Sequence, residues 1–540
     1  MRDEEKDQRA RTGLSRWALG ALSGALAAFA ALAVAELVAA VVRPQSSPIV
    51  AVGGASIDAT PAPVKDWAIR HFGTNDKLVL ELGILAVLAV AALALGVLAV
   101  RFRRVGTAGV LLFGVVGAVA AVNRPDSVGP ADMLPSVVGA MAGALLLYVL
   151  VGRLTAVKPS PAPAEAATEG ADSPLRADWD RRGFVLAAAS AAAASAAVGV
   201  VGRSLNASRG RGAVTSRERI VLPAPRSPAR PVPRGAGLRV PGISPFVTPN
   251  GDFYRVDTAL VVPKVDATGW RLRIHGKGVR RPTTYSFDDL LHRELIERNI
   301  TLTCVSNEVG GPYVGNARWT GVRLADLLAE CGVRPPSRGG PADQLVARSV
   351  DGMTIGSPVE ELMDGRDAML ALGMNGEPLP FQHGFPVRMV VPGLYGFVSA
   401  CKWIEDIELT TFDSYDPYWV KRGWARRAPI KTESRIDTPK PFARPKSGTV
   451  MIAGVAWAQH RGIEKVEVRI DDGPWQKAHL AAEDTRDTWR QWSMPWKATR
   501  GGHTLTVRAT DRTGAVQTEK RTRTIPDGAS GRHSVVVTVD

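Results

Sequence analysis

Four long apolar runs without a charged side chain lie in the first third of the chain, and they limit what this part can fold into. Each is close to the ~20 residues that span ~30 Å of hydrocarbon as a helix. A fifth run is weaker because most of its residues are alanine. We therefore expect four or five membrane-spanning helices, at about Ala18–Ala35, Leu82–Val100, Val105–Val122, Met133–Val151 and, for the weaker run, Phe184–Val201.

Basic residues beside the short loops indicate how these helices are oriented, since Lys and Arg are retained on the cytoplasmic side. Three basic groups fall on one side if all five runs cross: Arg2–Arg16, Arg101–Arg104 and Arg153–Arg182. The loops on the other side carry fewer basic residues for their length. The pattern predicts a multi-pass protein with a cytoplasmic N-terminus and with everything after the fifth run outside the cytoplasm.

Two arginines, Arg181 and Arg182, precede the fifth run and are followed by Phe184 and Leu186. This arrangement resembles a twin-arginine export signal, which sends folded, cofactor-loaded proteins across a membrane. The alternative is that the two arginines cap the cytoplasmic end of an ordinary helix. The internal position departs from the usual N-terminal one, so whether the chain is cut after it stays open.

Few side chains in or beside the apolar runs could act as functional groups or bind a cofactor. Glu36 directly follows the first run, inside the expected first span; it is either functional, as intramembrane acids often are, or near enough to the helix end to reach the interface. None of the eight histidines lies in the runs, so a bis-histidine haem inside this bundle is excluded. We expect neither haem nor an iron–sulfur cluster in this chain.

Two Pro-rich segments without apolar periodicity, 156–178 and 204–240, are typical of linkers. Between Arg203 and Arg234 there are eight Arg and one Glu, a net +7 out of the +15 of the whole chain. This charge either attracts anionic lipid head groups or keeps a tether soluble. No aromatic residues interleave the basic ones as a stacking platform for nucleic acid would need, so we expect no nucleic-acid partner.

After residue 240 short β-like runs alternate with turn residues, as in an α+β domain rich in strands. Trp270–Ile274 is such a run, and Ser286–Arg298 and Leu324–Cys331 are expected to be helical. Cys304 ends another β-run and enters a polar loop with two glycines. This placement suits a thiolate offered to a cleft, although a buried thiol at a strand end would have the same sequence.

The cysteine count excludes two classes of protein. Cys304, Cys331 and Cys401 permit at most one disulfide, which rules out a disulfide-stapled secreted scaffold. Three cysteines also exclude a four-cysteine zinc module.

Segment 301–322 closely resembles the molybdenum-binding segment of the sulfite oxidase family of molybdopterin enzymes, and the resemblance continues through 382–396 and Lys402-Trp403. It covers about Thr248 to the C-terminus. It implies a sulfite-oxidase-type molybdopterin domain in which Cys304 is the protein ligand of the molybdenum. It further implies contacts to the pterin and its phosphate from Tyr254, Arg255, His383, Arg388, Ser399 and Lys402. Trp319, in the first matching segment, is a further candidate catalytic residue.

Residues 433–540 have alternating runs typical of sandwich strands, with Asp471–Pro474 as a hairpin turn. They resemble the immunoglobulin-like dimerisation domain of the same family, which implies a possible homodimer. Loop 456–461 matches a loop that reaches the active site in that family. Arg461 is therefore a candidate substrate contact, although an exposed loop arginine is an equally good interpretation.

Composition and resemblance together divide the chain into six parts: a four-span membrane region 1–155, a linker 156–178, a fifth span with the export-like signal 179–203, a Pro/Arg-rich linker 204–240, a catalytic domain 241–432 and an immunoglobulin-like domain 433–540. We predict a membrane-anchored molybdenum oxidoreductase that transfers an oxygen atom to or from a small substrate outside the cytoplasm. A separate partner, a cytochrome or a quinone-linked protein, is expected to exchange the electrons.

Two alternatives remain open at this point. The chain could be a non-catalytic surface protein that keeps the fold for interactions, or it could reduce sulfoxides and not oxidise sulfite. Family members that oxidise sulfite have one arginine where this chain has Glu308, and another in the N-terminal segment where Val256 or the shifted Arg255 stands. The carboxylate of Glu308 would repel a dianionic substrate.

Overall fold

The computed structural model describes residues 2–61, 64, 67–68, 71–72, 76–156 and 181–540. Within them the chain forms two compact units. Unit 1 comprises Met1–Arg211 and Thr258–Val261, and unit 2 comprises Gly212–Asp257 and Val262–Asp540. The expected linker 156–178 lies, apart from Ala156, outside the described residues, as does Asp180 just before the two arginines.

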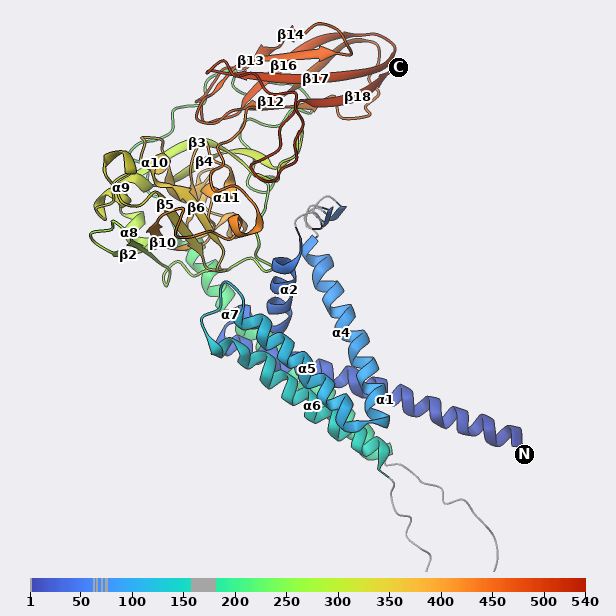
Figure 1. Ribbon diagram of the computed structural model, residues 1–540. Helices are drawn as coiled ribbons and strands as arrows, with labels where there is room; N and C mark the ends of the chain where they lie inside the picture. The colour runs from blue at the N-terminus through green and yellow to red at the C-terminus, as the bar shows by residue number, and fades with distance from the viewer. Residues whose placement is uncertain (1, 62–63, 65–66, 69–70, 73–75, 157–180) are drawn as a thin grey trace, which may run out of the picture. The chain divides into compact units, whose positions relative to one another are not determined.

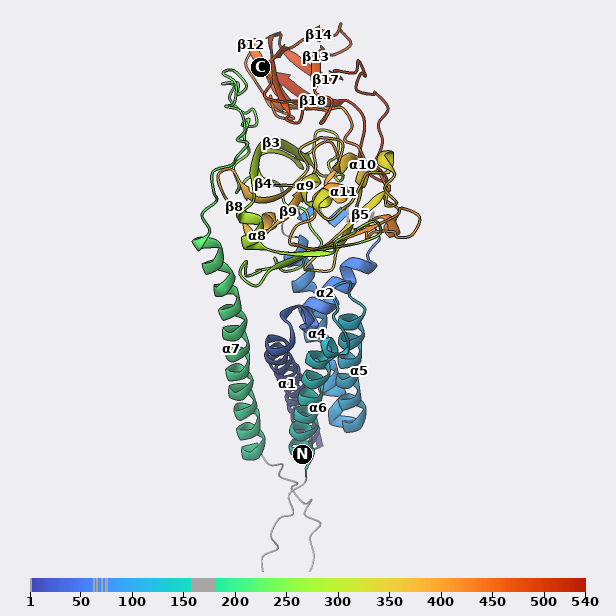
Figure 2. The same ribbon diagram turned by 90° about the vertical axis from the view of Figure 1, so that its left-hand side faces the viewer.

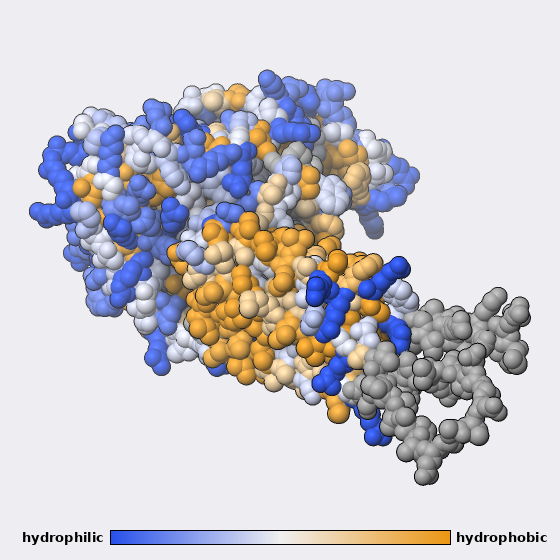
Figure 3. Space-filling view, turned by 60° about the horizontal axis from the view of Figure 1, so that its bottom comes forward, coloured by the Kyte–Doolittle hydropathy of each residue, from blue (hydrophilic) through white to orange (hydrophobic). Residues whose placement is uncertain are grey.

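Unit 1 is built from helices, as the runs of Ala, Leu and Val predict. Among the described residues, five helices are long and apolar enough to cross a membrane. Apolar side chains cover much of the face of unit 1 that Figure 3 shows, which would suit contact with lipid. These helices are α1 (Arg2–Val42), α4 (Asp76–Arg101), α5 (Arg103–Val122), α6 (Leu134–Thr155) and α7 (Arg181–Arg219).

Small residues allow α1 to pack closely on its neighbours in unit 1 (Figures 1 and 2). A Cβ at Gly24 would overlap the backbone of α4 at Ala92, and a Cβ at Gly143 would lie 2.7 Å from the carbonyl oxygen of Ala27. Gly and Ala at such interfaces let helix backbones approach in lipid. Near the end of α1, the hydroxyl of Ser47 donates to the carboxylate of Glu36.

The expected loop between the first two spans contains a further helix, α2 (Pro48–Ala59), which composition did not predict. Arg43, just before it, binds Asp126 and Asp132 in the turn between α5 and α6, with Nη2–Oδ2 distances of 3.2 and 3.3 Å. Both carboxylates are buried. This network joins the ends of three helices through ion pairs.

The expectation of a linker over 204–240 is wrong in its first part, because α7 continues to Arg219. The chain has no proline between Arg203 and Leu222, and its alanines and arginines favour a helix. In unit 2, Arg217 donates from Nε to the carbonyl of Leu379 (2.8 Å). The segment after the helix packs on the same unit, where Ser227 forms a bridge with Ile296.

Unit 2 begins with a five-stranded sheet in the order β2-β1-β10-β5-β6. The β1–β10 pair is parallel and the other pairs are antiparallel. Its strands are β1 (Arg271–Gly276), β2 (Thr283–Ser286), β5 (Gln344–Ser349), β6 (Thr354–Pro358) and β10 (Ile404–Thr410). The expected β-run at 270–274 thus begins one residue before β1 and ends two residues before the strand does.

A second, antiparallel sheet has the order β3-β4-β7-β8, with β9 pairing to β7. Apolar side chains of the two sheets and their helices form one hydrophobic core, which includes Trp319, Leu345 and Phe385. The strands are β3 (Leu295–Thr303), β4 (Val314–Arg323), β7 (Met369–Met374), β8 (Glu377–Pro378) and β9 (Arg388–Val390); the short helices are α8 (Phe287–Leu291), α9 (Leu324–Glu330), α10 (Val359–Leu362) and α11 (Gly396–Ser399).

The helix expected over Ser286–Arg298 is much shorter than predicted. Ser286 and Asp289 form a capping box at the start of α8, which fixes its first turn. The helix ends at Leu291, and β3 begins at Leu295 because Ile296 and Ile300 are buried by pairing with β4.

The C-terminal part of unit 2 consists of two four-stranded antiparallel sheets, β11-β12-β16-β15 and β14-β13-β17-β18. Side chains from both sheets, among them Ile452, Trp492, Val466 and Val507, share one core, so the sheets pack face to face (Figure 1). The strands are β11 (Glu433–Thr438), β12 (Gly448–Trp457), β13 (Ile463–Ile470), β14 (Gln476–Lys477), β15 (His479–Leu480), β16 (Arg490–Ala498), β17 (Gly501–Asp511) and β18 (His533–Val539).

Candidate active site

Cys304 is the first residue after β3, where the strand opens into a loop. Its backbone N–H donates to the carbonyl of Tyr313 (2.9 Å), which holds the two ends of the loop together. The side-chain oxygen of Asn307 accepts from the N–H of Tyr313 (2.8 Å) and closes the loop further. Cys304 is buried, and burial raises the pKa of its thiol, against lowering contributions from Ser306 and Lys402.

Arg388 is the first residue of β9, which pairs with β7 in the second sheet, and its side chain is buried. Its guanidinium lies over the ring of Trp319, 5.0 Å from the centroid, and Nη1 donates to the carbonyl of His383 (3.2 Å). Its Nε is buried and has no hydrogen-bond partner among the described residues. Burial lowers the pKa of Arg388 to about 10, so the side chain is still charged at neutral pH.

His383 is a neutral imidazole in this setting. Burial and, to a smaller extent, the nearby cations Arg388, Lys402 and Arg255 lower its pKa to about 4, against a raising hydrogen bond to Asn250. Its Nε2 lies 2.9 Å from the carbonyl oxygen of Asn250, so Nε2 carries the proton and Nδ1 is an acceptor.

Arg255 and Lys402 meet at one carboxylate, that of Asp257. Its Oδ2 accepts from Arg255 Nε at 2.9 Å and from Lys402 Nζ at 2.6 Å. The side chain of Asp257 is 3% exposed. Lys402 also donates to the carbonyl of Gln382 (3.2 Å), which fixes it beside the segment that ends at His383.

Tyr254 and Ser399 complete the set expected to contact the pterin. Burial raises the pKa of the Tyr254 phenol, which lies near Cys304 and Arg388. The ring of Tyr254 stacks on Phe253 with centroids 5.1 Å apart. The hydroxyl of Ser399 donates to the carbonyls of Leu394 and Tyr395, both at 3.0 Å, and thereby holds the start of α11.

Arg461 is not bonded to any residue of this group. It donates to Asp511 Oδ2 (2.8 Å), to the carbonyl of Ile430 (2.9 Å) and to Thr432 (3.1 Å). Its neighbour Gln459 does reach the strand before the cysteine, where Nε2 donates to the carbonyl of Thr301 (2.8 Å). The loop after β12 therefore supports β3 through Gln459, and the guanidinium of Arg461 is committed to the C-terminal sheets.

Sequence reasoning missed Asp257 and Gln459. Asp257 stands two residues after Arg255, and this i, i+2 spacing places both side chains on one face of an extended segment. That spacing was the available signal. Gln459 lies in the quoted loop, but nothing local distinguishes a buried amide from an exposed one.

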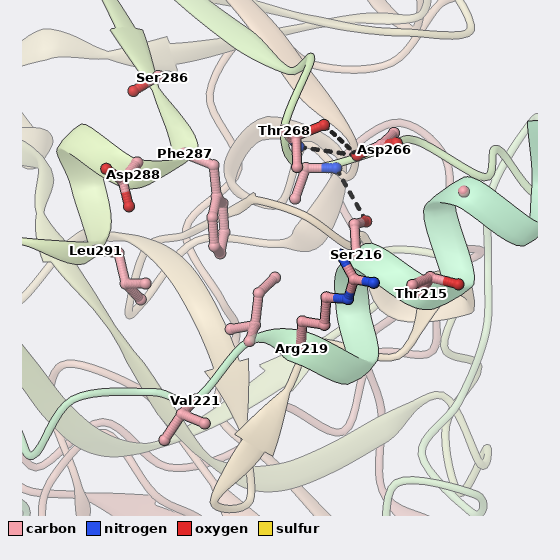
Figure 4. Close-up of a pocket in the computed structure, with 13 residues that line it drawn as sticks. Thr215, Ser216, Arg219, Val221, Asp266, Thr268, Ser286, Phe287, Asp288 and Leu291 are labelled. Carbon is pink, nitrogen blue, oxygen red and sulfur yellow. Dashed lines mark hydrogen bonds between the residues drawn. The ribbon is translucent and has the colours of Figure 1, made fainter.

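A separate cavity of about 860 Å³ lies in unit 2 between the last turns of α7 and the region of α8 (Figure 4). Its lining includes none of the residues predicted for the site. The carboxylate of Asp266 accepts from the backbone and hydroxyl of Thr268, at 2.9 and 2.8 Å, and Ser216 accepts from the N–H of Ala267 (3.2 Å). These polar groups are thus satisfied by one another.

The residues around Cys304 fit a molybdopterin. An anionic phosphate needs converging cationic donors, and Arg255, Arg388 and Lys402 are close enough to depress the pKa of the same histidine. The unpartnered Nε of buried Arg388 is a donor that lacks only an acceptor. The single buried thiol of Cys304 suits a metal that is bound chiefly by its own organic ligand and needs one thiolate from the protein.

Comparison with known proteins gives the same region. Residues 259–419 match the model of the family described as "Oxidoreductase molybdopterin binding domain". The chain is 32% identical over 162 residues to "Uncharacterized oxidoreductase YuiH" of Bacillus subtilis (strain 168), covering 30% of this chain and 75% of that protein.

Longer relatives match over a similar region. Identity to human "Sulfite oxidase, mitochondrial" is 30% over 290 residues, 46% of this chain and 53% of that protein. The chain thus spans about half the length of the curated sulfite oxidases it matches. The crystal structure of the sulfane dehydrogenase SoxCD from Paracoccus pantotrophus is similar at 24% identity with a TM-score of 0.47, covering 55% of this chain and 84% of that chain.

Proposed function

The chain belongs to the sulfite oxidase family of molybdopterin-dependent oxidoreductases, and we propose that it transfers an oxygen atom to or from a small substrate on the outer side of a membrane. One observation carries the proposal. The unpartnered Nε of Arg388 and two further cations, Arg255 and Lys402, lie around one neutral histidine, and Lys402 is also close enough to the buried thiol of Cys304 to lower its pKa. A protein that kept the fold only for interactions would have no need of a buried guanidinium with an unused donor.

The named residues would bind different parts of the cofactor. When bound, the molybdenum cofactor supplies two-electron oxygen-atom chemistry. Cys304 would be the ligand from the protein; because burial raises the pKa of its thiol, metal binding must displace the thiol proton. Arg388, Lys402 and Arg255 would bind the phosphate, and Nδ1 of His383 would accept from an N–H of the pterin.

Aromatic side chains keep water away from this group. Trp319 is fully buried beneath Arg388 and donates to the carbonyl of Ile300 (3.1 Å). Phe253 packs edge-on against both Trp319 and His383, with ring centroids 5.7 and 5.6 Å apart. Exclusion of water strengthens the attraction between the cations and an anionic group. Trp319 is therefore proposed to act through Arg388.

The substrate is proposed to be a neutral or monoanionic oxygen donor or acceptor, a class that includes sulfoxides. Glu308 is exposed in the loop after Cys304, where it would disfavour a dianion such as sulfite. Arg461 is too firmly paired with Asp511 to replace the missing arginine without breaking that ion pair.

Location and partners are part of the same proposal. The five long apolar helices and the distribution of Lys and Arg support a multi-pass protein with a cytoplasmic N-terminus, and the pair Arg181-Arg182 supports export by the twin-arginine route. Electrons would pass to or from a separate cytochrome or quinone-linked protein. The paired C-terminal sheets are proposed to be an immunoglobulin-like module that makes a homodimer.

Metal and pterin analysis of the purified full chain in detergent tests the central claim. We expect about one molybdenum and one pterin per chain, measured by elemental analysis and by fluorescence of the oxidised pterin. Steady-state rates with sulfite and with a neutral sulfoxide, using artificial electron carriers, then give the substrate class. A protein from a molybdenum-replete host that holds neither metal nor pterin would contradict the proposal.

A further inference from the structure

We infer that Asp257 is a positioning residue that holds Arg255 and Lys402 together as one phosphate-binding pair, which assigns Arg255 to the cofactor and not to the substrate. The inference rests on the proposed function, because the phosphate is that of the pterin. The inference goes beyond the proposed function because it gives a role to Asp257, a carboxylate inside a cluster of cations.

The contacts of Asp257 are unusual for a buried acid. One oxygen, Oδ2, accepts from both Arg255 Nε (2.9 Å) and Lys402 Nζ (2.6 Å), and the acid is almost completely buried. Arg255 and Asp257 belong to one short segment, whereas Lys402 follows 145 residues after Asp257. The carboxylate therefore joins two parts of the chain that meet only in the folded site.

The geometry leaves the Nη donors of Arg255 for another anion. Arg255 is bonded to Asp257 through Nε, and among the described residues no hydrogen bond engages its Nη groups. A planar guanidinium held by Nε presents its two Nη groups in a fixed direction. Lys402 is held by Asp257 and by the carbonyl of Gln382, so its ammonium is also fixed in place.

A charge count supports a doubly charged ligand. Arg255, Arg388 and Lys402 contribute three positive charges, Asp257 contributes one negative charge, and His383 is neutral near pH 7 because its pKa is about 4. The net charge of +2 matches a phosphate monoester, which carries about −1.5 to −2 at pH 7. Asp351 is a further acid near this cluster, and burial raises its pKa.

Removal of the Asp257 charge has two opposing effects. It raises the net charge that an anion meets, but it also lets two neighbouring cations repel each other and move apart. An anion that already faces three cations gains little from one more unit of charge, whereas charge-assisted hydrogen bonds need donors in place. We therefore expect loss of the carboxylate to weaken retention of the cofactor.

A matched control exists in the same unit. Asp367 also joins two cations, with Arg298 Nε at 2.5 Å and Arg323 Nη2 at 3.0 Å, but it lies at a half-exposed site apart from the cluster. Asp367→Asn therefore removes a bridging carboxylate of the same kind without touching the proposed phosphate site.

The test uses the full chain in detergent, loaded in a host that makes the cofactor. Molybdenum and pterin contents, the half-time of pterin loss after dilution, and KM per loaded molecule are measured for the wild type, Asp257→Asn, Asp367→Asn and Arg255→Gln. We expect the half-time to shorten by about tenfold in Asp257→Asn, since charge-assisted contacts are lost, and to stay at the wild-type value in Asp367→Asn. Arg255→Gln should lower pterin content and leave KM near its wild-type value.

The outcomes separate the inference from the proposed function. A wild-type protein without molybdenum and pterin would contradict the proposed function itself. A loaded wild type whose Asp257→Asn variant keeps pterin equally long would overturn the inference alone. Should Asp257→Asn fail to fold, Arg255→Gln decides: normal pterin content with a KM raised about tenfold, as loss of a substrate contact would give, would place Arg255 at the substrate and overturn the inference.

Discussion

Gly310, in the loop after Cys304, leaves the space that the imidazole of His533 occupies. A Cβ at Gly310 would overlap the ring of His533, which comes from the first residue of β18. Next to it, Arg435 Nη1 donates to the carbonyl of Gly311 (2.8 Å). The C-terminal sheets therefore hold the loop that carries the proposed metal ligand, in addition to any role in forming a dimer.

Gly310→Ala is expected to destabilise unit 2 and to lower molybdenum content. The backbone of Gly310 has φ +81°, which disfavours any side chain, and the methyl group would also push His533 away. Together these effects should cost about 2–4 kcal/mol. The control is Gly514→Ala, at φ +85° in open space, which has the strain without the overlap. Thermal unfolding compares the two; equal losses would show that His533 does not press on the loop.

Acid should destabilise unit 2 through His533. Burial lowers the pKa of His533 to about 4, and Nδ1 accepts from the N–H of Ile436 (3.0 Å). The unfolded chain, with an ordinary histidine pKa near 6.5, binds the proton first, so the free energy of unfolding falls as the pH falls from about 6.5 to about 4.

His533→Asn keeps a hydrogen-bond acceptor but removes the titrating group. The slope of the free energy of unfolding against pH should therefore fall, by at most the amount that corresponds to one proton. Denaturant titrations at several pH values measure the slope. His383 titrates over the same range and remains in both proteins. An unchanged slope in the variant would mean that His533 does not carry the effect.

Cys304→Ser should remove molybdenum and turnover with little loss of stability, because a hydroxyl is a poor ligand for a metal that prefers a thiolate. Cys331→Ser is the control; this buried thiol lies at the end of α9, 3.8 Å from the hydroxyl of Tyr285. Elemental analysis and thermal unfolding are measured on both. Full molybdenum content in Cys304→Ser would contradict the assignment of the ligand.

Arg181→Lys combined with Arg182→Lys should keep unit 2 in the cytoplasm. The positive charge is preserved, so only the guanidinium pair that a twin-arginine receptor reads is lost. Protease added to spheroplasts should then fail to remove a C-terminal tag, which it removes in the wild type. The paired change Arg103→Lys with Arg104→Lys, at the start of α5, serves as control. Unchanged cleavage would indicate export by the general route.

Glu308→Arg should lower the KM for sulfite by roughly tenfold, since ~1.4 kcal/mol of restored attraction is a factor of ten. The KM for a neutral sulfoxide should change little. Glu294→Arg, at an exposed site before β3, makes the same change of charge away from the loop. Efficient sulfite oxidation by the unmodified protein, with no response to Glu308→Arg, would show that other residues bind the anion.

Local sequence predicted the elements that depend on local composition. The apolar runs predicted the long helices of unit 1, and the β-run expected at 270–274 agrees with β1 to within two residues at each end. The position of Cys304 directly after a strand was also readable, because a β-run that stops at Gly and polar residues needs no distant partner to be recognised. Where a distant partner decided the outcome, as for the strand that begins at Leu295, the prediction was wrong.

The sequence by itself thus determined which segments are apolar helices, where the proposed metal ligand stands and which cations are available. Tertiary structure alone decided that Asp257 joins Arg255 to Lys402, that Arg461 binds Asp511, and that His533 fills the space beside Gly310. The physical reason is sequence distance. Helix and strand formation depend largely on neighbours in the chain. The role of a buried charge, or of a glycine that leaves space, depends on a partner residue that is distant in the sequence and is brought close only by folding.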